Sequence, residues 1–260
     1  MSKTIESHLT EDRVFTPAKE FSTKARISSL AQYKKLYKES IEKPHLFWAR
    51  EAKELLWHKP WSKVLDWKAP FAKWFVGGTT NLCHNAVDRH LAERADQPAL
   101  IFVSTETDTE KTYTYRELHG EVQRMAAILQ SLGVVKGDRV LIYMPMIAEA
   151  AFAMLACVRL GAIHSVVFGG FASHSLATRI EDASPKVIIS ADAGSRGGKG
   201  VPYKPLLDEA IQLSAHKPAN VIMVDRQLAA FTPVAGRDVD YATERAKHIH
   251  TVVPCEWVES

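Results

Sequence analysis

The chain has 260 residues, of which 46% are hydrophobic and 24% charged, a balance typical of a globular protein with a sizeable core. The 33 basic and 30 acidic residues leave a net charge of +3 without a basic run, which argues against a nucleic-acid groove. The three cysteines, Cys83, Cys157 and Cys255, are widely spaced and none forms a CxxC pair. This pattern argues against a disulfide framework and a zinc site, and it suits a protein of a reducing compartment.

Residues 1–30 form a polar leader that we expect to be partly flexible. This segment contains no apolar run of the kind that a secretory signal needs. The longest apolar stretch of the chain, Ala150–Val158, is far shorter than the roughly twenty residues that cross a bilayer. We therefore expect a soluble, cytoplasmic protein without membrane or nucleic-acid partners.

Residues 31–92 form a small, Trp-rich helical module in this interpretation. Apolar residues in Tyr33–Leu56 follow helical spacing, and a loop interrupted by prolines comes next. Five of the six tryptophans lie between Phe47 and Phe75. We expect these rings to pack onto a larger body rather than to hold a ligand, and a contact surface for another subunit is the alternative.

From residue 93 to residue 260, apolar runs alternate with helical periods, as in a parallel sheet covered on both faces. The expected strands are Ala99–Val103, Val140–Met144, Ser165–Phe168, Val187–Ser190 and Val221–Val224. The expected helices are Leu118–Leu132 with a stop at Gly133, about Ile147–Leu160, one from an N-cap at Ser173 to a stop before Pro185, and about Pro205–Ala215. The fold class is therefore α/β, with a doubly wound, mostly parallel sheet.

Two segments that follow predicted strands carry the candidate binding residues, because open α/β sheets bind ligands beyond the carboxyl ends of their strands. In the first, Gly169 and Gly170 stand between a strand and the helix that follows. Paired glycines let a ligand approach the backbone closely, and a helix N-terminus offers free N–H groups to an anion. A tight turn between strand and helix explains the same glycines without a ligand.

The second segment, residues 191–202, contains four glycines together with Arg196 and Lys199, a composition suited to phosphate. A kinase or ATPase loop is excluded because a P-loop needs four residues between its first glycine and the Gly-Lys pair. Here Gly194 stands too close to Gly198, and Gly200 replaces the hydroxyl residue that would hold magnesium. A metal-free phosphate site and a merely mobile surface turn both remain open, and no catalytic residue or metal site is identified.

Several segments resemble the AMP-forming short-chain acyl-CoA synthetases, the acetyl-CoA and propionyl-CoA synthetases. In chain order they are Pro70–Phe75, Asn81–His90, Gly137–Val140, Tyr143–Met146, Gly161–Phe171 and Ser190–Asp192. The resemblance extends from about Val14 to Ser260. Asn81–Asn85, Arg196–Lys199 and Gly236–Asp240 are more similar to propionyl-CoA members, whereas Val76–Gly78 is more similar to acetyl-CoA members.

The resemblance implies that ATP and a short-chain carboxylate, with propionate favoured over acetate, form an acyl-adenylate and release pyrophosphate, after which the CoA thiol displaces AMP. It also implies CoA contacts at Gly169, Gly170, Arg196, Lys199, Val201 and Pro202. Residues 93–260 would be the first part of the AMP-binding domain, and the ATP loop, the Mg²⁺ site and the catalytic lysine would follow Ser260. We therefore expect an amino-terminal fragment that is inactive alone; a naturally short, noncatalytic CoA-binding module is the alternative.

Overall fold

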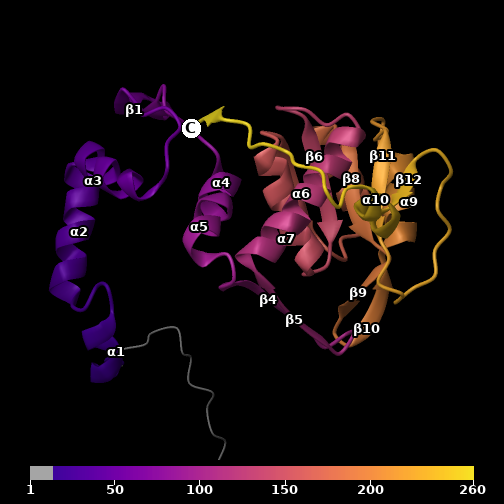
Figure 1. Ribbon diagram of the computed structural model, residues 1–260, viewed down its shortest axis with the longest axis horizontal. Coiled ribbons are helices and arrows are strands. Elements are labelled where there is room, and N and C mark those ends of the chain that lie inside the picture. Colours follow the sequence, from indigo (N-terminus) through magenta and orange to yellow (C-terminus); the bar gives the residue numbers. More distant parts are fainter. Residues whose placement is uncertain (1–13) are drawn as a thin grey trace, which may run out of the picture. The chain divides into compact units, whose positions relative to one another are not determined.

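The computed structural model describes residues 14–260, which divide into two compact units at Glu54 and Leu55 (Figure 1). Residues 1–13 of the expected leader lie outside the described residues; the rest of the leader includes the short helix α1, Lys19–Lys24. The first unit continues with α2, α3 and a 3₁₀ turn, η1; their bounds are Leu30–Glu42, Pro44–Glu51 and Ala52–Glu54. The predicted domain boundary at residues 92 and 93 is based on the resemblance and stays a prediction.

The Trp-rich segment forms a β-hairpin where we expected a loop. Strand β1, Lys63–Lys68, pairs antiparallel with β2, Phe71–Val76, and this register sets Leu65 opposite Trp74. Aromatic and aliphatic side chains that face one another across two strands stabilise such a ribbon, and Pro70 occupies the turn where no ladder donor is needed. The expectation of a loop was wrong because the prolines bound the strands instead of interrupting them.

A second antiparallel pair follows four short elements. The short elements are β3, Thr79–Thr80; α4, Leu82–Ala86; the 3₁₀ turn η2, Asp88–His90; and α5, Leu91–Arg94. Strand β4, Pro98–Ser104, then pairs with β5, Thr109–Thr114. The predicted strand Ala99–Val103 therefore exists, but it lies outside the parallel sheet because a short turn makes β5 its nearest partner.

Five strands form one parallel sheet in the order β12-β11-β8-β6-β7. Their bounds are Arg139–Met144 for β6, Ile163–Phe168 for β7, Val187–Ala191 for β8, Asn220–Val224 for β11 and Asp238–Asp240 for β12. The predicted α/β, doubly wound fold is confirmed. Strand β12 was not predicted, because three residues with two aspartates carry no apolar run.

Helices cover both faces of this sheet, and Figure 1 shows α6 and α7 side by side on one of them. One face packs against α6, Tyr115–Ser131; α7, Ala148–Arg159; and α10, Tyr241–Lys247. The other packs against α8, Ser173–Ala183, and α9, Tyr203–Leu213. Strand β6 shows the alternation: Val140 and Ile142 face the first layer, and Leu141 and Tyr143 face the second. Across residues 14–260, no helix combines the length and the apolar character needed to span a bilayer.

The starts of α6 and α8 are capped differently: α6 begins with a capping box, whereas α8 lacks the N-cap that we predicted for it. At the start of α6, Thr114 Oγ1 accepts the Glu117 N–H at 3.2 Å and Glu117 accepts the Thr114 N–H at 2.8 Å, a capping box. The predicted N-cap at Ser173 was wrong, since the cap residue of α8 is Ala172. Ser173 Oγ instead donates to Glu209 Oε2 at 2.5 Å, because a carboxylate on the neighbouring helix is a stronger acceptor.

The last residues of the second unit run back from α10 toward α4 and the β1–β2 hairpin (Figure 1). Strand β13, Val258–Glu259, pairs antiparallel with β3, and Trp257 stacks on His58 with ring centroids 4.5 Å apart. Asn81 Nδ2 donates to the Glu256 carbonyl at 2.7 Å, and the Glu256 N–H donates to the Arg159 carbonyl at 2.8 Å. The segment is therefore held by backbone and side-chain contacts to residues far away in the sequence.

Candidate functional site

A cavity of about 500 Å³ lies where strands β6 and β7 end. Segments from the β4–β5 turn, the strand ends, the glycine-rich segment and α9 line it. The polar or glycine positions among the lining residues are Ser104, Thr105, Glu106, Gly169, Ser195, Tyr203 and Arg226. Both segments that the sequence singled out thus contribute to one cavity, at the edge of the sheet where α/β folds bind ligands.

The first candidate segment makes the tight connection between β7 and α8. Gly170 has φ +95°, which an L-residue rarely adopts. A Cβ on Gly169 would overlap the Tyr203 hydroxyl and lie 2.8 Å from Tyr203 Cζ. Gly169 is therefore required by packing against Tyr203, whether or not a ligand also approaches it.

The second candidate segment is an ordered hairpin instead of a mobile turn. Strand β9, Ala193–Arg196, pairs antiparallel with β10, Lys199–Pro202. Gly197 and Gly198 form the connection with φ +59° and +76°, the two positive values that a two-residue type I′ turn requires. Since glycines supply this turn, the composition that suggested mobility produces a defined structure. Lys199 is exposed directly beside the turn.

The other predicted CoA residues occupy defined positions on the same hairpin. Arg196 pairs with Lys199 in the strand register, Val201 with Gly194, and Pro202 with Ala193. Val201 packs on the hydrophobic cluster beneath the sheet. The two cationic residues thus lie together at the hairpin tip, while Val201 and Pro202 lie nearer to the sheet.

Tyr203, the first residue of α9, connects the two candidate segments. Its side chain is 4% exposed, and Cβ atoms on Gly169 and on Gly194 would both overlap its hydroxyl. Burial raises the pKa of Tyr203, so the phenol stays protonated and available as a hydrogen-bond donor. Sequence reasoning missed Tyr203, whose signal is its place directly after Pro202 at the start of a helix.

An ion pair between distant residues fixes the hairpin. Glu106 Oε1 accepts the Ser195 N–H at 2.7 Å, and Glu106 Oε2 pairs with the Arg226 guanidinium. Arg226 Nη1 donates to the Ala193 carbonyl at 3.0 Å. Glu106 and Arg226 are 120 positions apart, and no local pattern in the sequence reveals such a pair.

Asp192 organises the loop that carries Arg226. Its fully buried carboxylate accepts the N–H groups of Arg226, Leu228 and Ala229 at 3.1, 2.6 and 3.0 Å. Three such bonds satisfy a buried charge without a counter-ion. The sequence signal for this role was the position of Asp192 directly after a buried strand.

The arrangement is built to bind and position a ligand, because the carboxylate that lines the cavity, Glu106, is neutralised by Arg226. The hairpin backbone, the exposed Lys199 and a phenol hydroxyl suit a phosphorylated ligand. For metals, the described residues bring three donor side chains together in one place, Cys83, Asp88 and Cys255, and these belong to another part of the unit.

Comparisons with known proteins give the chain a family. The family model described as "Acetyl-coenzyme A synthetase N-terminus" matches residues 33–86, and the model described as "AMP-binding enzyme" matches residues 87–253. The chain belongs to the AMP-binding enzyme family. The expected resemblance to short-chain acyl-CoA synthetases is thereby confirmed.

Individual relatives in this family are similar to most of the chain. "Propionate--CoA ligase" of Salmonella typhimurium is 57% identical over 229 residues, and "Acetyl-coenzyme A synthetase" of Methylobacterium radiotolerans is 48% identical over 235 residues. Each match covers 88% of this chain but 36% of the relative. The solved "Acetoacetyl-CoA Synthetase from Streptomyces lividans" has a TM-score of 0.78 at 27% identity, covering 93% of this chain and 37% of that one. The chain therefore spans little more than a third of the length of these relatives.

Proposed function

We propose that this chain is part of an AMP-forming short-chain acyl-CoA ligase and carries part of its CoA site. The observation that carries the proposal is that Tyr203 joins the Gly169 turn and the β9–β10 hairpin beside one cavity. Two segments chosen from the sequence for their glycines and charges are neighbours in space. The names of the relatives support a carboxylate and CoA as substrates, and the "AMP-binding enzyme" model supports ATP as the third.

In this proposal, ATP and the carboxylate form an acyl-adenylate with release of pyrophosphate, and the CoA thiol then displaces AMP. Gly169 and Gly170 leave the backbone accessible to the CoA chain. Arg196 and Lys199 at the hairpin tip attract its 3′-phosphate, and Val201 and Pro202 lie beside the adenine. Propionate is favoured over acetate, since the relative with 57% identity is named for propionate and the one with 48% for acetate.

The CoA site is tested by comparing CoA with dephospho-CoA, which lacks the 3′-phosphate, in a calorimetric titration. Arg196→Ala together with Lys199→Ala should weaken CoA binding by roughly 1.5–3 kcal/mol per lost charged contact. The same variant should bind dephospho-CoA almost as the unchanged chain does. Lys73→Ala, which removes an exposed cation from the other hairpin, is the matched control. Equal CoA affinity in all three proteins would remove the role of the hairpin.

The ligase activity needs a separate test, because the ATP loop, the Mg²⁺ site and the catalytic lysine are proposed to follow Ser260. The 260-residue chain should show no carboxylate-dependent exchange of pyrophosphate into ATP, and a protein that continues into those segments should exchange with propionate faster than with acetate. Exchange by the 260-residue chain alone would contradict the proposed division of the site. CoA binding without exchange in the longer protein would favour the noncatalytic module.

A further inference from the structure

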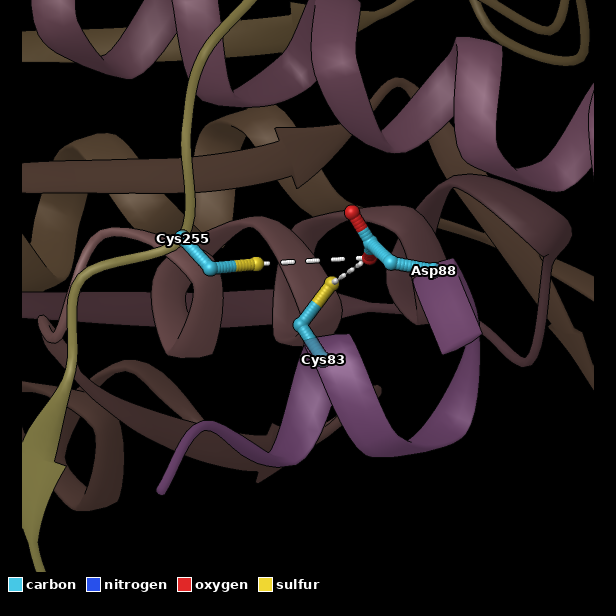
Figure 2. Close-up of side chains that lie close together, drawn as sticks. All are labelled: Cys83, Asp88 and Cys255. Carbon is cyan, nitrogen blue, oxygen red and sulfur yellow. Dashed lines mark hydrogen bonds between the residues drawn. The ribbon is translucent and has the colours of Figure 1, made fainter. Parts of the chain in front are cut away.

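Two cysteines that are far apart in the sequence converge on one carboxylate away from the cavity. Figure 2 shows Cys83 on α4 and Cys255 on the C-terminal segment, both pointing toward Asp88. The distances from their sulfurs to Asp88 Oδ2 are 3.9 and 4.0 Å, and the three donor atoms lie within 4.8 Å of one another. Nothing in the proposed ligase chemistry uses this group.

A metal ion is disfavoured because a cation already occupies the place. Arg159 Nη1 lies 2.9 Å from Asp88 Oδ2 and 3.5 Å from Cys83 Sγ, and Arg159 Nη2 lies 2.8 Å from Asp88 Oδ1. The Arg159 side chain is 4% exposed. A zinc ion usually takes four ligands, and here it would face a buried guanidinium with three. The cluster is therefore a pair of neighbouring thiols beside a buried ion pair.

The two thiols differ in their reactivity. The hydrogen bond from the Cys83 thiol lowers the pKa of Cys255, and the Arg159 charge acts in the same direction, against partial burial and the charge of Asp88. The pKa of Cys83 is raised by its bond to Cys255 and by burial. Cys255 is half-buried, so its thiolate is the accessible nucleophile, while Cys83 is fully buried beside it.

We propose that Cys83 and Cys255 are a peroxide-sensitive pair that forms a reversible disulfide. The Cys255 thiolate attacks one peroxide oxygen and the O–O bond breaks. A sulfenic acid forms on Cys255, and the released hydroxide is protonated to the first water. Cys83 sulfur then attacks that sulfur, the S–O bond breaks, and a second water carries away the thiol proton. Two thiols lose two electrons in total, hydrogen peroxide is reduced to two waters, and a thiol reductant reverses the bond.

The sulfurs lie within 4.8 Å of one another, so a bond of about 2 Å requires a local shift. Cys255 lies in an irregular stretch of the C-terminal segment, between the hydrogen-bonded residues Val253 and Glu256, whereas Cys83 is in a helix, so we assign this shift to Cys255. The bond would fasten this segment covalently to α4. The remaining cysteine, Cys157, is an internal control because burial within α7 raises its pKa to about 12.

The test is limited exposure of the purified 260-residue chain to hydrogen peroxide, followed by alkylation of the remaining thiols and peptide mass mapping without reductant. We expect a linked pair of peptides that contain Cys83 and Cys255, a loss of two hydrogen atoms in intact mass, and full reversal by dithiothreitol. In Cys83→Ser, a sulfenic-acid probe such as dimedone should label Cys255. Cys157→Ser should oxidise as the unchanged chain does.

Thermal melting of each variant establishes that it is folded. If a variant unfolds, the peptide map of the unchanged chain still shows whether Cys83 and Cys255 become linked. Absence of the Cys83–Cys255 link under conditions that oxidise a comparable thiol pair, or dimedone labelling confined to Cys157, overturns the proposal. One equivalent of zinc retained by the unchanged chain, with both thiols protected from peroxide, would identify the group as a metal site and also overturn it.

Discussion

At the carboxyl end of the parallel sheet, glycines and charged side chains surround an open cavity, whereas at the opposite end a buried arginine joins three distant segments. Arg159, at the end of α7, pairs with Asp88 and donates from Nε to the Val253 carbonyl at 2.6 Å. Near the cavity, Lys199 is exposed at the hairpin tip, and a Cβ on Gly200 beside it would meet no atom within 4 Å. The first region keeps polar groups available for a ligand, and the second uses them to hold the chain together.

The largest effect should come from breaking the buried pair. Arg159→Met removes the guanidinium from the Asp88 carboxylate, leaves it paired with His119, and should lower the free energy of unfolding by about 3–5 kcal/mol in urea denaturation. Lys136→Met is the control, because it removes an ion pair to Glu256 whose side chains are 54% and 48% exposed. It should cost less than about 1 kcal/mol. Equal costs would mean that the buried cluster adds no stability.

The same pair should give the stability a defined pH dependence. Burial alone would raise the pKa of Asp88, but hydrogen bonds and charge from His119 and Arg159 outweigh it, so the pKa lies below its usual range. Stability from this carboxylate is then fully present above its unfolded pKa of about 3.9 and is lost as pH falls through the lower folded value. The difference in unfolding free energy between the unchanged chain and Asp88→Asn should be full at neutral pH and shrink in acid. A difference that is constant from neutral pH into strong acid would contradict the assigned shift.

Near the cavity, a smaller loss of stability should follow from placing a side chain against Tyr203. Gly194→Ala places a methyl group against the Tyr203 ring and should cost about 1–3 kcal/mol in urea denaturation. Tyr203→Phe in the same chain removes the overlapping hydroxyl and should recover part of that loss. Gly200→Ala is the matched control, because a Cβ there meets no atom within 4 Å and should leave stability nearly unchanged.

The smallest effect should be local to the hairpin. Glu106→Gln weakens the charge-assisted bond to the Ser195 N–H and should speed exchange of that amide by roughly tenfold in hydrogen-exchange experiments. Glu110→Gln, at an exposed position of β5, is the control. Unchanged exchange at Ser195 would show that the glycine turn alone holds the hairpin.

The elements that the sequence predicted well are those whose apolar residues form one continuous run or recur at one clear helical spacing. The apolar run Val140–Met144 became β6, and the helical spacing that ends at Gly133 became α6, since Gly133 adopts φ +80° as a helix stop requires. The two candidate binding segments were also predictable, because glycines at strand ends are a local signal.

Interactions between distant residues could not be predicted in this way. Cys83, Asp88, Arg159 and Cys255 meet only after the chain has folded, and each looks unremarkable among its neighbours in sequence. The Ser173 cap failed for the same reason, since its acceptor Glu209 belongs to another helix. Where local preference competes with a tertiary partner of higher charge, the partner decides.

The C-terminal segment gives the assembly of this unit an order in time. Asp88 and Arg159 leave the ribosome well before Val253 and Cys255, and chains acquire structure from the amino terminus during synthesis. The Arg159 guanidinium can therefore pair with Asp88 first, and Arg159 Nε can donate to the Val253 carbonyl only after residue 253 has been synthesised. Until the C-terminal segment arrives, the nascent chain exposes the end of α7 and the thiol of Cys83 to the surrounding solution.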